Sequence, residues 1–87
     1  MLYMVIERFK NGDAKPIGAR FKHQGRMLPD GVVYHSSWVD ALGLRCFQIM
    51  EAPNAELLDA WMAHWKDLVD FEVVPVFTSA DFWRRLE

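Results

Sequence analysis

Four polar side chains fall on two consecutive apolar segments, at spacings that could bring them together for binding or catalysis. They are His35, Ser37, Cys46 and Gln48. If residues 40–43 form a hairpin loop, His35 faces Gln48 and Ser37 faces Cys46 on one side of the two strands. Polar groups ringed by apolar ones are typical of small-molecule pockets, where a histidine can act as acid, base or ligand. Alternatively, His35 and Gln48 bond to each other or to a partner chain in an interface.

Two tryptophans offer a second lining surface. Trp61 and Trp65 lie one helical turn apart and could border a cavity between a helix and a sheet. The alternative is ordinary filling of the core by large aromatic side chains. His64 falls beside this pair in the helical pattern and is expected to face solvent.

The other titratable groups give weaker signals. Cys46 is expected to be a small buried hydrophobic residue rather than a nucleophile. Glu7, Glu51 and Glu72 lie near strand ends, where any could act as a general base, but no paired-carboxylate spacing supports this and we expect them on the surface. No catalytic residue is assigned. The ligand-binding candidates are His35, Ser37, Cys46, Gln48, Trp61 and Trp65.

Composition restricts the classes of partner. The chain has 87 residues, of which 52% are hydrophobic and 25% charged, and its net charge is −2. This length fits a single domain over residues 1–87 with one modest core. The charge balance lacks the basic surface that binds nucleic acids or anionic membranes, so neither partner is expected. No apolar run approaches the roughly 20 residues of a membrane helix, and no leader pattern is seen, so we expect a cytoplasmic protein.

Cysteine and histidine usage also argues against a bound metal. Cys46 is the only cysteine, so no disulfide can form within the chain. The three histidines show no i, i+4 pair that would suit a metal site. We therefore expect neither a metal nor a cofactor.

The elements that position these residues follow from hydrophobic periodicity. Alternating or continuous apolar residues predict strands over residues 1–7, 32–39, 44–51 and 71–78. Two helices and a short terminal helix separate or follow these strands. The resulting order is βαββαβ, which is typical of a ferredoxin-like α+β fold with a four-stranded antiparallel sheet and two helices on one face. Right-handed crossovers place the first and third strands in the centre, and Pro75 fits an edge strand.

The helix ends are marked by capping and breaking residues. The first helix is predicted to begin near Asp13 and to end at Gly25 or Met27. The second is predicted to begin after the N-cap Asn54, and Ser79 is expected to cap the terminal helix. The second helix carries an apolar stripe at helical spacing, made of Leu57, Leu58, Trp61, Met62, Trp65 and Leu68.

Both faces of the predicted sheet are apolar. Leu2, Met4 and Ile6 point to one side of the first strand, and Tyr3 and Val5 point to the other. A single layer of helices would leave one apolar face uncovered. A second copy packed sheet to sheet would cover it, so we expect a homodimer. The alternative is that the terminal helix folds back over the open face.

Several segments resemble the bacterial DUF3303 family. They are residues 1–9 (MLYMVIERF), 25–29 (GRMLP), 37–39 (SWV), 45–51 (RCFQIME) and 65–76 (WKDLVDFEVVPV). The resemblance covers nearly the whole chain and implies no particular activity. The chain also looks like a member of the wider dimeric α+β barrel group, which includes monooxygenases, isomerases and haem-degrading enzymes. That resemblance implies the dimeric fold, but the first strand lacks the asparagine that the haem-degrading members use, so their chemistry does not carry over.

Two functions follow from these observations. The first is a small dimeric barrel that binds a hydrophobic or aromatic small molecule, as a cofactor-free oxygenase or isomerase. The second is a non-catalytic dimeric module for binding or sensing. A cavity that contains His35 or another titratable group favours the enzyme, whereas a collapsed apolar core with His35 at the dimer interface favours the module.

Overall fold

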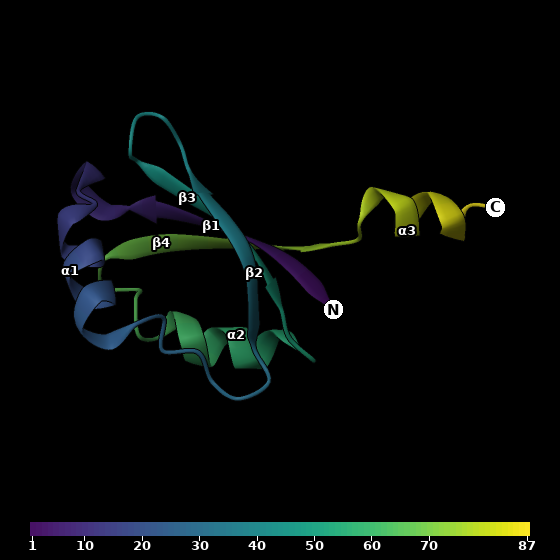
Figure 1. Cartoon of the computed structure of the whole chain (residues 1–87), viewed down its shortest axis with the longest axis horizontal. Helices are drawn as coiled ribbons and strands as arrows, with labels where there is room; N and C mark the ends of the chain where they lie inside the picture. The colour runs from purple at the N-terminus through teal and green to yellow at the C-terminus, as the bar shows by residue number, and fades with distance from the viewer.

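A computed structural model describes residues 1–87 and shows an α+β fold (Figure 1). The βαββαβ order predicted from the sequence is confirmed, with a further helix at the C-terminus. The elements are β1 (Leu2–Phe9), α1 (Lys15–Gln24), β2 (Val33–Val39), β3 (Arg45–Glu51), α2 (Ala55–Met62), β4 (Val69–Val76) and α3 (Ser79–Arg85). A short 3-10 turn, Lys10–Gly12, joins β1 to α1. The longest helix has 10 residues, so none could cross a bilayer.

The four strands form one antiparallel sheet in the order β2-β3-β1-β4. β1 and β3 therefore occupy the centre, as the crossover rule predicted. Pro75 lies on the edge strand β4, opposite Tyr3 of β1. A proline there leaves the central hydrogen bonds intact because the outer side of β4 has no neighbouring strand.

The register of the β2–β3 hairpin differs from the predicted one. Ser37 pairs with Gln48 and Val39 pairs with Cys46, while His35 has no partner because the register shifts between Tyr34 and Ser36. The predicted pairing of His35 with Gln48 and of Ser37 with Cys46 is wrong. The loop is closed by the Asp40 N–H, which donates to the Arg45 carbonyl at 3.0 Å. That displaces the pairing, and the extra residue forms a β-bulge.

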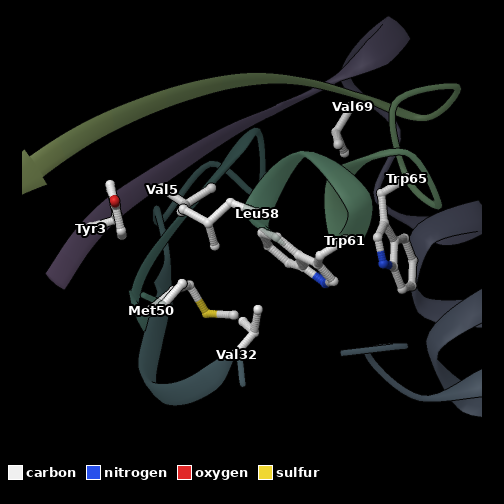
Figure 2. Close-up of a cluster of buried hydrophobic side chains, with 9 residues drawn as sticks. Tyr3, Val5, Val32, Met50, Leu58, Trp61, Trp65 and Val69 are labelled. Atoms are coloured by element: carbon white, nitrogen blue, oxygen red, sulfur yellow. The ribbon is translucent and has the colours of Figure 1, made fainter. Parts of the chain in front are cut away.

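The sheet has an inner face that carries the core and an outer face that does not. On β1 the inner face consists of Tyr3, Val5, Glu7 and Phe9, which alternate with the outward residues. Figure 2 shows Leu58 and Trp61 projecting from α2 toward Val5. The buried hydrophobic core comprises Tyr3, Val5, Val32, Met50, Ala52, Leu58, Trp61, Trp65 and Val69.

Two helix ends form as the capping residues predicted, and two differ. The Asn54 side chain accepts the Leu57 N–H at 3.1 Å, which caps α2. α1 ends at Gly25, whose φ of 68° is readily adopted by glycine. α2 ends at Met62 and is followed by turns, although the apolar stripe continues. Thr78 caps α3 in place of Ser79, by accepting the Asp81 N–H at 3.1 Å.

The C-terminal helix α3 extends away from the sheet (Figure 1). It has no buried residue, and its aromatic side chain Trp83 is 63% exposed. The alternative in which this helix folds back over the open face is therefore wrong for the single chain. The outer face remains uncovered, with Val74 and Trp38 among its exposed apolar side chains.

Candidate functional site

A cavity of about 240 Å³ lies between the inner face of the sheet and the helices. The three strands β1, β2 and β3 form its floor, α1 forms its roof, and the segments after α1 and around the end of α2 form its wall. Its lining residues are Glu7, Phe9, Ile17, Gly18, Phe21, Arg26, Ser37, Val39, Cys46, Gln48, Trp61 and Trp65. Most of this lining is apolar, and the polar groups are concentrated on the floor.

The structure brings five of the six candidate residues to this cavity. They are Ser37, Cys46, Gln48, Trp61 and Trp65. His35 lies elsewhere because the bulge removes it from the alternation of β2. Its Nε2 atom is 2.9 Å from Oε1 of Glu51, and both side chains are substantially exposed. His64 is exposed, as predicted, and so are Glu51 and Glu72.

Glu7 is the residue at the centre of the floor, and the expectation that it lies on the surface is wrong. Only 6% of it is exposed. The side-chain amide of Gln48, itself buried, donates to the Glu7 carboxylate from the paired strand β3. The alternation of side chains along the strand could have predicted its burial, because Glu7 shares the inner face of β1 with Tyr3 and Val5.

The environment of Glu7 changes its acidity. Burial raises the pKa of this carboxyl from 4.5 to about 7, while the bond from Gln48 and the positive charge of Arg26 oppose the rise. Glu7 is therefore poised between its acid and base forms near neutral pH. A carboxyl group with this property inside a cavity can transfer a proton to or from a bound molecule.

Cys46 also lines the floor but is a poor nucleophile. Burial and the nearby Glu7 carboxylate raise the pKa of its thiol to about 11, against the lowering effect of Arg26. It is therefore a neutral thiol at physiological pH. Since only the thiolate is strongly nucleophilic, Cys46 is a poor nucleophile. Cys46 is only partly buried, whereas the sequence predicted a buried residue.

The two tryptophans hold the wall of the cavity together. The indole Nε1–H groups of Trp61 and Trp65 both donate to the backbone carbonyl of Arg26, at 3.0 and 3.1 Å. Both side chains are buried, so each indole fills the core and finds a partner for its polar end. The segment that they hold contains Gly25 at φ 68° and Met27 at φ 60°. A left-handed methionine costs about 1 kcal/mol or more, which indicates that the surrounding contacts impose this conformation.

Arg26 is a second site residue that sequence reasoning missed. Its guanidinium lies 3.5 Å from the ring centroid of Tyr34 and 5.0 Å from that of Phe21. It forms no salt bridge with any carboxylate of the chain. No sequence motif marks it, because its position depends on the turn after α1 and on the two distant tryptophans.

The residues present do not form a metal site. No group of three or more His, Cys, Asp or Glu side chains is close enough to hold an ion. The site is instead a mostly apolar cavity with a titratable carboxyl group, Glu7, bonded to Gln48 on its floor and a cation in its wall.

Comparisons with known proteins place the chain in one family. The model of a family described as "Domain of unknown function (DUF3303)" matches residues 1–87, the whole chain. Neither the curated proteins nor the solved structures contain a match. The coverage is complete, and it agrees with the resemblance found in the sequence. The chain belongs to the DUF3303 family.

Proposed function

We propose that this protein binds a small hydrophobic or aromatic molecule in the cavity beneath α1. The observation that carries the proposal is the buried Glu7–Gln48 pair at the floor of a mostly apolar cavity. Such a combination gives affinity through the apolar walls and orientation through a few polar groups. An apolar cavity of about 150 Å³ holds benzene. The volume of 240 Å³ therefore suits a molecule with one ring and a few substituents.

Benzyl alcohol is a suitable neutral probe of this cavity. Its binding is measured by the fluorescence of Trp61 and Trp65, after the exposed Trp38 and Trp83 have been replaced by phenylalanine. We expect saturable quenching with a Kd of about 1 mM or tighter. Gly18→Leu should weaken binding by about tenfold or more, because a side chain at Gly18 meets nothing within 4 Å and enters the open space.

The matched control is Ala19→Leu on the exposed side of the same helix. It adds a larger side chain of the same type to α1 without entering the cavity lining. Equal loss of binding in both variants, or no saturable signal in the parent protein, would contradict the proposal.

A catalytic role is the second candidate, and the acid–base character of Glu7 favours it over the non-catalytic module. An isomerase would use Glu7 to remove a proton from one carbon of the ligand and return it to another, with no change in the number of electrons. One-ring ketones and lactones incubated in D₂O should then incorporate deuterium, as measured by NMR. Glu7→Gln should abolish the incorporation, and its absence from the parent protein would favour the binding module.

We further propose that the protein is a homodimer that forms through its outer sheet face, in the manner of a dimeric α+β barrel. The support is the uncovered apolar surface, to which Val74 and Trp38 contribute. A cytoplasmic location fits the free thiol of Cys46. Light scattering at micromolar concentration should give about twice the mass of 10.2 kDa.

A charge placed on the outer face tests this assembly. Val74→Asp should give a monomer, because the dimer would otherwise bury an unpaired carboxylate. Leu42→Asp is the control, since this residue is exposed in the hairpin loop. A parent protein that is monomeric at micromolar concentration would refute the dimer.

A further inference from the structure

We infer that the ligand of this cavity is an anion, a one-ring carboxylate whose charged group pairs with Arg26. This inference rests on the proposed binding function and narrows its ligand class. It comes from an arginine that lines an apolar cavity without a carboxylate partner in the chain.

The other arginines show how unusual this position is. Arg8, Arg20, Arg45 and Arg84 each form a salt bridge with an aspartate or a glutamate. Arg85 also lacks a carboxylate partner, but it is exposed on the protruding helix α3, where its guanidinium carbon lies 4.5 Å from the ring centroid of Phe77. Arg26 is half-buried and is the one cation in the cavity lining. A cation kept in an apolar wall without a partner is typical of a site that awaits an anion.

The geometry around Arg26 leaves its hydrogen-bond donors available. The guanidinium carbon of Arg26 lies 3.5 Å from the ring centroid of Tyr34 and 5.0 Å from that of Phe21, in cation–π contacts. A cation–π contact uses the charge of the guanidinium and does not use up its five N–H donors. None of them donates a hydrogen bond within the chain. A planar carboxylate matches this donor edge through two parallel bonds.

The backbone that carries Arg26 is fixed before any ligand arrives. Trp61 and Trp65 hold its carbonyl, and Met27 beside it is kept in the left-handed region. A side chain on such a fixed segment loses less freedom when it binds a ligand. The arrangement therefore favours Arg26 as a recognition residue over Arg26 as a surface charge.

Below neutral pH, Glu7 carries no negative charge that could neutralise the guanidinium of Arg26. The titratable side chains of the cavity are Glu7 and Cys46 on the sheet and Arg26 on the wall, and neither helix contributes another. Because burial keeps Glu7 protonated until about pH 7, it can donate a hydrogen bond to a carboxylate. Above this pH its own negative charge repels the ligand. Binding of a carboxylate should therefore weaken as the pH rises through 7.

The test compares benzoate with benzyl alcohol by fluorescence at pH 6 and pH 8. The two probes share one ring, and benzoate is ionised at both pH values. At pH 6 we expect benzoate to bind about tenfold tighter or more, because a charge-assisted bond is roughly twice as strong as a neutral one. At pH 8 the benzoate affinity should fall by about tenfold, and Glu7→Gln should remove most of that fall.

Arg26→Met should weaken the binding of benzoate by about tenfold more than it changes the binding of benzyl alcohol, so that the preference for benzoate is lost. Arg26→Lys should keep part of the preference, and it remains informative if the methionine variant does not fold. Lys22→Met is the control, because it removes a positive charge from the exposed side of α1. Equal affinities for the two probes, insensitive to Arg26→Met, would overturn the inference and leave the neutral-ligand function standing. Failure of both probes would overturn the proposed function as well.

Discussion

The two helices on the inner face of the sheet cover it in different ways. α2 places Leu58 and Trp61 in the core, where the sheet residues Val5 and Met50 are fully buried. α1 has no buried residue, and its aromatic side chain Phe21 is 45% exposed. The cavity lies under α1.

α1 packs against the core through Ile17 and is also held by polar contacts. Arg20 donates to both carboxylate oxygens of Asp67 at 2.7 Å and to the carbonyl of His64 at 2.8 Å. These bonds connect the helix to the segment after α2 without filling the space beneath it. The contrast teaches that one end of this small domain is stabilised by packing, whereas at the other end hydrogen bonds position a helix above an unfilled cavity.

The largest expected effect is at the packed end. Leu58→Ala should lower the free energy of unfolding by about 3 kcal/mol, because the deleted atoms leave a cavity that the neighbours fill only partly. Phe21→Ala at the open end should cost about 1 kcal/mol, since much of that side chain is already in water. Urea denaturation measures both. Equal losses would show that the two ends do not differ as described.

A pH effect of comparable or smaller size is expected from Glu7. Its pKa is 4.5 in the unfolded chain and about 7 in the folded one, so the folded protein holds the proton over this range after the unfolded chain has lost it. The contribution of Glu7 to the free energy of unfolding should therefore be greatest below pH 4.5. It should fall by up to about 3 kcal/mol as the pH rises to 7.

Urea denaturation from pH 4.5 to 8 tests this dependence. Glu7→Gln should flatten the profile in this range. Glu72→Gln, on the outer face, serves as the control and should leave it unchanged. The difference in the free energy of unfolding between the parent protein and Glu7→Gln should fall as the pH rises. A difference that rises with pH would contradict the assigned burial of Glu7.

The smallest expected effect on stability is that of Gly18→Ala in α1, which tests whether this glycine keeps space open in the cavity. Gly18→Ala should raise the free energy of unfolding by about 0.5 to 1 kcal/mol, because alanine favours a helix and the added methyl group clashes with nothing. The same methyl group reduces the cavity, so benzyl alcohol should bind more weakly. A variant that is more stable and also binds the probe more tightly would show that Gly18 does not preserve ligand space.

Much of the fold could be predicted because it depends on local periodicity. Alternation of apolar residues located the strands. Asn54 marked a helix start through its side-chain cap, and Gly25 marked a helix end because glycine readily adopts a positive φ. The strand order followed from chain handedness, and Pro75 agreed with it. The early end of α2 at Met62 could not be predicted, since Trp65 and Leu68 keep helical spacing although they lie in turns.

The site was less predictable because it depends on register and on long-range contacts. The bulge at His35 adds a residue that no local pattern announces, and it removes that side chain from the inner face. Glu7 lies near the end of its strand, where a charged residue is usually exposed, and its burial is accompanied by a side-chain bond from Gln48 of the neighbouring strand. Arg26 depends on two tryptophans that lie 35 and 39 residues away in the sequence.

The double hydrogen bond on the Arg26 carbonyl has a consequence for how this family can diversify. Trp61 and Trp65 grip the main chain of that residue, and every amino acid supplies the same carbonyl oxygen. The side chain at position 26 is therefore free to vary while the segment keeps its place. The backbone of residue 26 therefore holds the segment in place whatever its side chain is. A single codon change at this position could replace the side chain that faces the cavity and so alter which ligand is preferred.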